Sequence, residues 1–388
     1  MKFVVFTHPQ FLASTSMPLF ARSIVDGLRA RKMDVTTLSP EPLFHRIPCP
    51  TKFKKWLGYL DQFLLFPPTA YFKTRNLPAD TIFIFTDQAL GPWIPFFAKR
   101  PHAVHCHDLL ALRSALGELP QNPVSFTGKV YQRYIRRGFN HGKNFICVSH
   151  RSKQELLRFL DRPNNVRTEV VHNGLNYPFF PLPAEIATQL LKTAGAGDLA
   201  SGFLLHVGGN QWYKHRAGVI AIYAEYANRV SNPLPLLMIG AQPDDRVQQQ
   251  LAKVPGAGKV VFLIRPSTEV IHGAYSLASA LLFPSLAEGF GWPIIEALAC
   301  GCPVLTTNDA PMTEAGGNAA SYLPVLNGNP NEWAKNSADI LKALLERPSA
   351  EQEQVRQAGL QHANQFSEEH TIDRYLAIYR AVMEEANV

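Results

Sequence analysis

Cysteine is scarce in this sequence, and its placement excludes several classes of site. Among 388 residues there are five cysteines, an odd number, and no Cys or His pair stands at the spacing of metal ligands. Cys300 and Cys302 are separated by one residue, which is too close for a redox Cys-x-x-Cys pair or for half of a zinc site. We therefore expect small, buried cysteines in a reducing compartment.

Long apolar runs are also missing. No window of about 20 residues is free of charges and turn residues, so the sequence predicts no membrane-spanning helix. The first residues enter a strand at once, without the basic region, apolar stretch and cleavage site of a secretory signal. We therefore expect a cytoplasmic protein, which could be in peripheral contact with the inner face of a membrane.

Several familiar nucleotide-binding motifs are absent. No G-x-G-x-x-G follows the first strand, which disfavours a Rossmann dehydrogenase, and no G-x-x-x-x-G-K-[ST] occurs, which disfavours a P-loop kinase. The sequence has no zinc finger, no RNP-like aromatic motif and no Lys/Arg tract, so we expect no nucleic-acid partner. A net charge of +7 nevertheless favours anionic partners such as anionic lipids or phosphorylated small molecules.

What the sequence does contain is a strand-helix alternation that runs twice along the chain. Apolar residues make up 46% and charged residues 18%, a globular composition, and the length suggests more than one domain. The Pro-rich stretch 177–183 separates the two runs, which predicts α/β domains at 1–183 and 184–366 with parallel sheets and a cleft between them. An amphipathic helix is expected at 367–388. The expected strands are 4–7, 35–38, 82–85, 103–106, 144–149 and 166–172, then 203–207, 236–239, 260–263, 280–283 and 303–306.

The densest chemical signal is the stretch 283–306. A strand ends at Phe283, a loop with two glycines follows, and Pro293 stands where a helix would begin. Glycines before a helix N-terminus expose N–H groups to phosphate, whereas Glu288 and Glu296 beside them can accept hydrogen bonds from hydroxyls. Phosphate plus hydroxyls describes a nucleotide-sugar. The alternative interpretation is a glycine-rich turn with two surface glutamates.

This stretch, "EGFGWPIIEALACGCPV" with Glu288-x7-Glu296, resembles the signature of glycosyltransferase family 4, retaining enzymes of GT-B architecture that use nucleotide-sugar donors. The resemblance extends along most of the chain and includes "LLHVGGNQWYKHR" and "TEAGGNAASYLPV" in the second domain. In the first domain it covers "HCHDL", "FICVSHRSKQELLRFL" and "VVHNGLNYPFFP". The final helix resembles the family's C-terminal segment, which crosses back to the first domain.

The resemblance implies a role for each matching residue. Glu296 would bind the ribose hydroxyls and Glu288 a hydroxyl of the donor sugar. Lys214 would neutralise the leaving diphosphate, where negative charge grows as the glycosidic bond breaks. The remaining matches are the backbone at Gly208, Gly209, Gly289, Phe290 and Gly291, which would meet the phosphates, and His107, which would lie beside the donor sugar.

Each role has a simpler structural alternative. Lys214 could be a solvated lysine at a helix start, and His107 could be satisfied by nearby backbone. His105 is expected to face the core, and Asp108 to cap the next turn. No Asp-x-Asp motif follows a strand, and cationic side chains with helix N–H groups can replace a metal on the diphosphate, so we expect no essential metal and no cofactor.

Two departures from the family pattern stand out. Most members have Val-Gly-Arg where this chain has Val207-Gly208-Gly209, and either Arg216 or Arg265 could supply the missing arginine. The loop 9–18 lacks the glycine pair that many members use, which leaves the acceptor's position open.

The resemblance implies transfer of a hexose from a nucleotide donor, UDP-hexose first and GDP-mannose next, to a glycan or lipid-linked acceptor. One alternative is a non-catalytic, nucleotide-sugar-binding partner subunit, which the missing arginine would suit. Another is a relative of the same architecture, such as an epimerase or a phosphorylase, although no pyridoxal lysine motif is present.

A basic and aromatic segment in the first domain suggests a membrane partner. Residues 52–66 combine three lysines with several large apolar side chains, and Arg133, Arg136 and Arg137 lie on an expected helix. Interfacial segments need both kinds of residue, charges for anionic headgroups and rings for the acyl boundary. The alternative is an ordinary helix packed on the first sheet, with solvated lysines.

Overall fold

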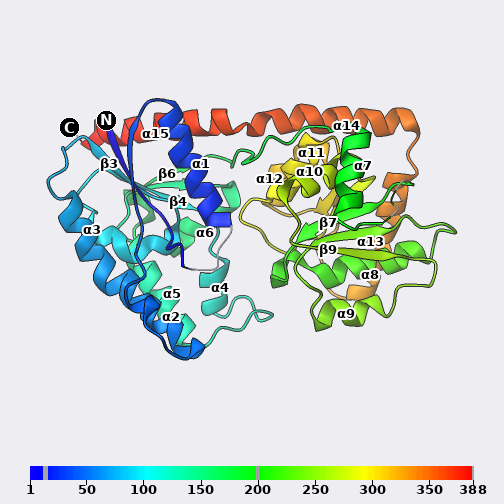
Figure 1. Ribbon diagram of the computed structural model, residues 1–388, viewed down its shortest axis with the longest axis horizontal. Coiled ribbons are helices and arrows are strands. Elements are labelled where there is room, and N and C mark those ends of the chain that lie inside the picture. The colour runs from blue at the N-terminus through cyan, green and yellow to red at the C-terminus, as the bar shows by residue number, and fades with distance from the viewer. Residues whose placement is uncertain (12–15, 198, 200, 387–388) are drawn as a thin grey trace. The chain divides into compact units, whose positions relative to one another are not determined.

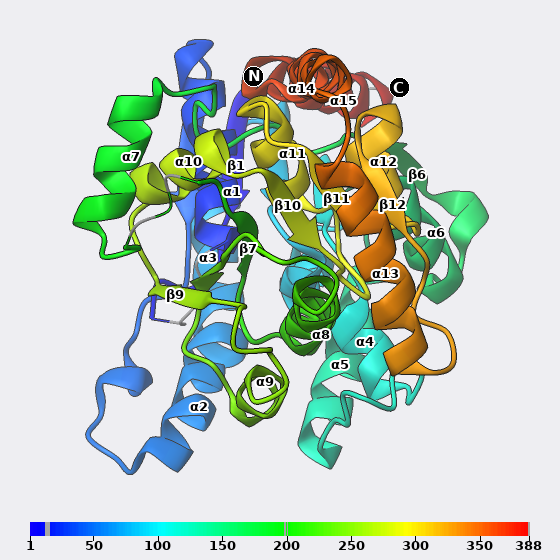
Figure 2. The same ribbon diagram turned by 90° about the vertical axis from the view of Figure 1, so that its right-hand side faces the viewer.

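The computed structural model describes residues 1–386 apart from 12–15, 198 and 200. The chain divides into two compact units, shown in Figure 1 and, turned by 90°, in Figure 2. Unit 1 is Met1–Asn176 with Glu368–Val388, and unit 2 is Tyr177–Ser367. Residues 12–15 of the first βα loop, and the last two residues of the expected final helix, lie outside the described residues.

Unit 1 is built on a parallel sheet with the strand order β2-β1-β3-β4-β5-β6. Its strands are β1 (Lys2–Phe6), β2 (Asp34–Leu38), β3 (Thr81–Phe85), β4 (His102–Cys106), β5 (Asn144–Cys147) and β6 (Arg167–Val170). Its helices are α1 (Ser16–Ala30), α2 (Thr51–Tyr59), α3 (Phe66–Thr74), α4 (Leu110–Ala115), α5 (Phe126–Phe139), α6 (His150–Phe159) and α15 (Glu368–Ala386). Shorter turns are η1 (Phe44–Arg46), the π-helical η2 (Leu60–Leu65), η3 (Gln88–Phe96) and η4 (Pro163–Asn165).

Unit 2 repeats this plan with the strand order β12-β11-β10-β7-β8-β9. Its strands are β7 (Leu204–Gly208), β8 (Leu236–Gly240), β9 (Val260–Ile264), β10 (Ala280–Phe283), β11 (Val304–Thr307) and β12 (Ser321–Leu323). Its helices are α7 (Ala184–Thr193), α8 (Arg216–Ala227), α9 (Asp245–Leu251), α10 (Thr268–Leu277), α11 (Trp292–Ala299), α12 (Met312–Gly316), α13 (Pro330–Leu345) and α14 (Ser349–Ala363). Single turns are η5 (Trp212–Lys214), η6 (Gly317–Ala319) and η7 (Asn364–Phe366). The expected pair of Rossmann-like parallel sheets is confirmed.

The central strands of both sheets are buried, as their unbroken apolar runs predict for parallel sheets covered on two faces. In unit 1 the core is rich in aromatic rings, with Phe6 stacked on Phe85 at a centroid distance of 4.7 Å and close to Phe97 at 4.8 Å. Fully burying one such side chain contributes roughly 1.5–3 kcal/mol. Four of the five cysteines are buried and all are unpaired, as expected.

Helix α15 packs on unit 1 beside α1 and β4. Its Tyr375 and Tyr379 are almost completely buried, and the hydroxyl of Tyr379 lies 2.7 Å from Nε2 of His105. Arg31, the residue after α1, donates a hydrogen bond from Nε to the carboxylate of Asp373 at 2.6 Å. His105 therefore faces the core, as expected from the sequence.

Both sheets reverse their strand order at one point, and this positions the candidate sites. In unit 1 the reversal lies between β1 and β3, and in unit 2 between β7 and β10. Parallel α/β sheets bind ligands outside the carboxyl ends of their strands at this switch point. Among the described residues, no helix is both long and apolar enough to cross a membrane.

Candidate functional site

In unit 2 the switch point brings together the segments that follow β7 and β10. Strand β7 ends at Gly208, and the loop after β10 carries Glu288 and runs into α11. The backbone N–H of Leu286 donates to the carbonyl oxygen of Tyr213 at 2.7 Å, which ties the two loops to each other. The geometry therefore collects residues from two distant parts of the chain at the carboxyl edge of the sheet.

Helix α11 begins as its sequence predicts. Gly291 caps it with φ at +109°, a conformation that L side chains rarely adopt, and Pro293 stands in the first turn. A Cβ atom at Gly291 would also come within 3.1 Å of the Ile294 side chain. The glycine thus lets the loop turn sharply into the helix. Phe290 is buried and its ring contacts Phe366 at 5.7 Å, so its side chain belongs to the core of unit 2.

Lys214 and Glu288 form a close ion pair. Lys214 Nζ lies 2.7 Å from Glu288 Oε1, and the two side chains are only 15% and 8% exposed. The ammonium also lies over the ring of Phe283, 4.8 Å from its centroid. Partial burial strengthens such a pair, because fewer waters screen the two charges. Neither residue is the solvated surface residue of the alternative interpretation.

Glu296 is held by a tyrosine that the sequence did not single out. The hydroxyl of Tyr275, from α10, donates to Glu296 Oε2 at 2.9 Å. Burial among apolar neighbours raises the pKa of Glu296 to about 7, although the hydrogen bond from Tyr275 and the charge of Lys214 act in the opposite direction. The carboxyl group can therefore gain or lose a proton near neutral pH.

The two arginine candidates have different surroundings. Arg216 is buried, and its Nη1 donates to the side chain of Asn210 and to the Ala241 carbonyl, the latter at 2.9 Å. Its Nε and Nη2 have no hydrogen-bond partner among the described residues. Burial lowers the pKa of Arg216, and the nearby Asp244 partly offsets this.

Arg265 is exposed and follows β9, which is separated from β10 by β7 and β8. Its backbone has a positive φ of +47° and donates to the Gly240 carbonyl at 2.9 Å. Arg216, by contrast, follows Lys214 by two residues. Gly208 is close to Lys214 as well, since a Cβ built on it would lie 3.5 Å from the lysine Cβ. Gly209 follows it at the start of the loop that leads to Lys214.

His107 follows β4 in unit 1 and is buried. Its Nε2 donates to the carbonyl oxygen of Thr86 at 2.9 Å, and its ring lies edge-on to Phe20 with centroids 4.3 Å apart. Burial lowers the pKa of His107, against the attraction of Asp87. The ring is therefore neutral at pH 7, and because Nε2 carries the proton, Nδ1 is left as an acceptor. Asp108 caps the next turn through the Leu110 N–H at 3.1 Å, as expected.

Sequence reasoning missed a second polar pair at the switch point of unit 1. His8 follows β1, and its Nε2 lies 2.8 Å from Oδ2 of the buried Asp87, which follows β3. Burial alone would raise the pKa of Asp87, but the hydrogen bond and charge of His8 outweigh it, and the pKa is lowered. The two residues are 79 positions apart, so no local pattern relates them.

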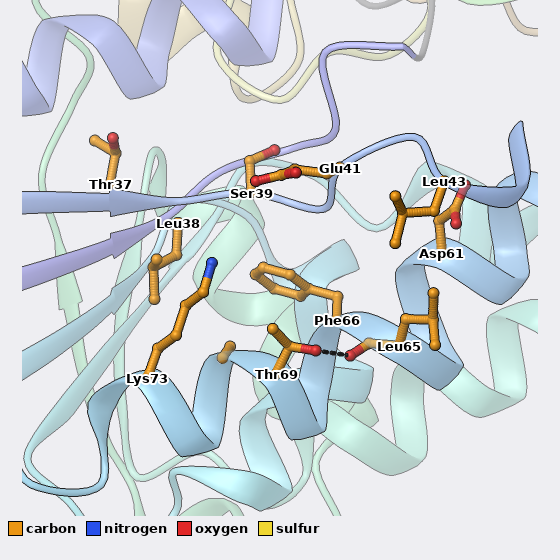
Figure 3. A pocket seen from close by; sticks show the side chains of 11 residues that line it. Thr37, Leu38, Ser39, Glu41, Leu43, Asp61, Leu65, Phe66, Thr69 and Lys73 are labelled. Atoms are coloured by element: carbon orange, nitrogen blue, oxygen red, sulfur yellow. Dashed lines mark hydrogen bonds between the residues drawn. The ribbon is translucent and has the colours of Figure 1, made fainter. Parts of the chain in front are cut away.

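Unit 1 also has a pocket that the sequence did not indicate (Figure 3). It has a volume of about 250 Å³ and lies between the end of β2 and the segment formed by η2 and α3. Phe66 and Leu38 give it apolar walls, and the amino group of Lys73 extends into it (Figure 3). Asp61 on its rim is bound by the backbone, because its two carboxylate oxygens accept hydrogen bonds from the N–H groups of Phe44 and His45, each at 2.8 Å.

Comparison with known proteins agrees with this geometry. Residues 198–360 match the family described as glycosyl transferases group 1, and residues 19–177 match glycosyltransferase family 4. The O-antigen chain mannosyltransferase B of Escherichia coli is 27% identical over 252 residues, 64% of this chain and 63% of the relative. The D-inositol 3-phosphate glycosyltransferase of Mycolicibacterium smegmatis is 34% identical over 287 residues, 71% of this chain and 61% of the relative.

Among solved structures, HepE of Anabaena in complex with UDP and glucose is similar, with a TM-score of 0.66 at 16% identity over 98% of this chain and 99% of that one. This likeness shows the shared fold. The matches to the two curated relatives span about three fifths of the length of each. The paired sheets, the Glu288-x7-Glu296 segment and the two matching domains together place this chain in glycosyltransferase family 4, with the GT-B fold.

Proposed function

We propose that this protein is a retaining glycosyltransferase that moves a hexose from a nucleotide-diphosphate sugar to a glycan or lipid-linked acceptor. The observation that carries the proposal is the cluster at the switch point of unit 2. There a glycine-rich loop runs into the N-terminus of α11, beside a lysine and two carboxyl groups. An anion meets the N–H groups of the loop and helix, and hydroxyls meet the carboxylates.

Lys214 can serve the diphosphate without leaving Glu288. An ammonium has three N–H donors, and the bond to Glu288 uses one of them. The ion pair holds the lysine in place before the donor binds, which lowers the entropy lost on binding. As the glycosidic bond breaks, negative charge grows on the leaving diphosphate, and a fixed cation stabilises that change. We propose that Lys214, with N–H groups of the loop and helix, does this without a metal or cofactor.

The two carboxyl groups are assigned to different sugars of the donor. Glu296 accepts hydrogen bonds from the ribose hydroxyls, and Glu288 accepts one from the transferred sugar. Tyr275 holds the Glu296 carboxyl in one orientation, which acceptance of two hydroxyls requires. The backbone at Gly208, Gly209, Gly289, Phe290 and Gly291 is assigned to the phosphates.

The arginine missing from the family pattern also has a proposed replacement. Of Arg216 and Arg265, Arg216 is the stronger candidate, because its buried guanidinium keeps Nε and Nη2 without partners among the described residues. Those two nitrogens form one edge of the guanidinium, which suits two phosphate oxygens. His107 is assigned to the donor sugar from unit 1.

A UDP-hexose is the favoured donor and GDP-mannose the next. HepE was solved with UDP and glucose, and one relative is named a mannosyltransferase, which supports these two in turn. The acceptor is proposed to be a sugar of a polysaccharide or glycoconjugate, as the name of the O-antigen relative supports.

The experiment that tests the proposal has two stages. Thermal unfolding with a panel of nucleoside diphosphates should show one base that raises the Tm most, because a ligand of the native state stabilises it by mass action. Donor consumption with the matching nucleotide-sugar is then followed with and without candidate acceptors, and the anomeric configuration of the product is read by NMR. Binding without turnover on any acceptor would favour a non-catalytic partner subunit, and an inverted product would exclude the retaining mechanism.

A further inference from the structure

We propose that one face of unit 1, formed by α2, Leu60 and α5, docks on an anionic lipid bilayer. Aromatic rings of α2 and of η2, the turn that follows it, contact rings of α5. Tyr59 stacks with Tyr131 at a centroid distance of 5.1 Å, and Phe63 meets Tyr134 edge-on at 5.6 Å. The exposed side chains of α2, Leu60 and α5 therefore lie on neighbouring parts of unit 1, and we call this surface the basic-aromatic face.

Large apolar side chains on this face point into solvent. On α2 and the turn after it, Phe53, Trp56 and Leu60 recur at helical spacing and are 50%, 52% and 38% exposed. On α5, Phe126, Val130 and Tyr134 recur every four residues and are 76%, 45% and 42% exposed. Single exposed apolar residues are ordinary, but two apolar stripes on adjoining helices indicate a surface that is covered in use.

The helices that form this face carry positive charge, and the one acidic residue in them and in η2 is buried. The segments α2, η2 and α5 contain seven lysines and arginines and a single acidic residue, Asp61. Asp61 is buried and takes two backbone hydrogen bonds, so it does not neutralise the surface. Unit 1 as a whole has 26 basic and 16 acidic residues, a formal charge of +10, whereas unit 2 has 12 and 15, a charge of −3.

Some cations of this face are bound to other groups of unit 1, and others are exposed and can contact a partner. Lys54 Nζ donates to the carbonyls of His45 and Ile47 at 2.7 and 3.0 Å, and Arg136 binds Asp161. These two residues, which the sequence pattern included, serve the fold of unit 1. The cations that remain exposed, without an ion pair among the described residues, are Lys52, Lys55, Lys129, Arg133 and Arg137.

This combination fits a bilayer better than other polyanions. Anionic headgroups attract the lysines and arginines, at about 1 kcal/mol for each near the surface, while the rings and aliphatic groups enter the acyl boundary. Single-stranded nucleic acid would use the aromatic rings for stacking, but it has no apolar layer in which Leu60 and Val130 could be buried. The proposal uses only unit 1 and does not depend on the donor site in unit 2.

The test is co-sedimentation of the full chain with vesicles. We expect binding to phosphatidylglycerol-phosphatidylcholine vesicles at low salt, none to phosphatidylcholine alone, and release at high salt. Lys55→Gln/Arg133→Gln/Arg137→Gln should weaken partitioning roughly 100-fold, from about fivefold for each lost charge. Trp56→Ser/Phe126→Ser should weaken it at least about tenfold through lost apolar burial.

The matched control removes the same charge elsewhere in unit 1. Arg22→Gln/Arg29→Gln/Arg380→Gln, on α1 and α15, should bind vesicles as the parent chain does; α1 lies away from α2 and α5 within unit 1 (Figure 1). Equal losses in both triple variants, or no sedimentation with anionic vesicles, would overturn the proposal. Tighter binding of a single-stranded oligonucleotide through the same residues would also overturn it. A chain that binds vesicles but no nucleotide would refute the proposed function and leave this surface in place.

Discussion

At the residue scale, the proposed donor site depends on how three ionisable groups share charge. Lys214 contacts Glu288 directly, and its charge also lowers the pKa of Glu296. Removing one member of the group changes the protonation and position of the others, so single substitutions will not be additive. Separate readouts of binding and turnover are therefore needed to assign the roles.

We expect Glu296 to make nucleotide affinity depend on pH. If the ionised carboxylate accepts the ribose hydroxyls, affinity should rise with pH through about 7, the pKa of this group in the folded protein. Glu296→Gln should lower affinity and remove that dependence, while Tyr275→Phe should shift its midpoint upward, because the hydrogen bond that favours the carboxylate is lost. Isothermal titration at several pH values measures this. A pH profile that is unchanged in Glu296→Gln would assign the dependence to another group.

The same pKa predicts how the free energy of unfolding changes with pH. The folded pKa of Glu296 is raised to about 7 from an ordinary 4.5, so the folded state retains a proton that the unfolded chain has lost. Its contribution to stability is complete below pH 4.5 and is lost as pH rises to 7, by roughly 3 kcal/mol for a pKa raised this far. Denaturant melts should show Glu296→Gln gaining relative stability over this window. A constant difference from pH 4 to pH 8 would contradict the raised pKa.

Glu288 is expected to act mainly on the rate, and Lys214 on both the rate and the affinity. Glu288→Gln should lower kcat with little effect on nucleotide affinity, because its proposed partner is the transferred sugar. Lys214→Ala should lower both affinity for the diphosphate and kcat, since its charge matters most as the leaving group departs. Steady-state kinetics with and without EDTA, together with nucleotide titrations, separate these effects. Full kcat in Glu288→Gln, an unchanged kcat/KM in Lys214→Ala, or loss of activity in EDTA would each refute one part of the assignment.

At the scale of elements, the start of α11 governs the direction of the N–H groups that we propose bind phosphate. Gly291 holds a φ of +109°, and its replacement by alanine should cost about 1–3 kcal/mol in the free energy of unfolding. The distorted loop should also weaken nucleotide binding. Gly117→Ala is the matched control, because Gly117 has a φ of +82° with no atom within 4 Å of the added methyl. Thermal melts and nucleotide titrations should show lost stability in both variants and lost affinity in Gly291→Ala alone.

At the scale of the whole molecule, α15 completes the core of unit 1 although it is far in sequence from the rest of that unit. Truncation after Ser367 should expose the surface that Ile372, Tyr375 and Tyr379 cover, and so lower the Tm strongly and increase aggregation. Tyr379→Phe removes only the contact with His105 and should cost about 1 kcal/mol. Calorimetry of the two variants compares these losses. A truncated chain as stable as the full chain would show that α15 is dispensable for unit 1.

The charge distribution is also a property of the whole molecule. The overall charge of +7 conceals a basic unit 1 and a slightly acidic unit 2. A surface of unit 1 that binds anionic lipid would bring the protein to acceptors carried by the membrane. Under the proposed function, this favours a lipid-linked acceptor over a soluble glycan.

The sequence alone was sufficient for the features that depend on neighbouring residues. Apolar runs separated by amphipathic stretches predict the parallel strands, and the structure confirms them to within a few residues at each end. The helix start at Gly291 and Pro293 follows from backbone dihedral preferences, and Ser149 caps α6 by accepting from the N–H of Ser152 at 3.0 Å. Strand β12 was missed because three residues are too few to show a period.

Only the tertiary structure decided which distant side chains meet. The partners Lys214 and Glu288 are 74 residues apart, and His8 and Asp87 are 79 apart, and no repeat or spacing in the chain connects them. Tyr275 carries no motif, yet it holds Glu296. On the basic-aromatic face, the sequence cannot show that Lys54 and Arg136 are bound to other groups of unit 1 while Lys55 and Arg133 face solvent. Backbone preferences act between neighbours, whereas these contacts arise from the order in which strands assemble into a sheet.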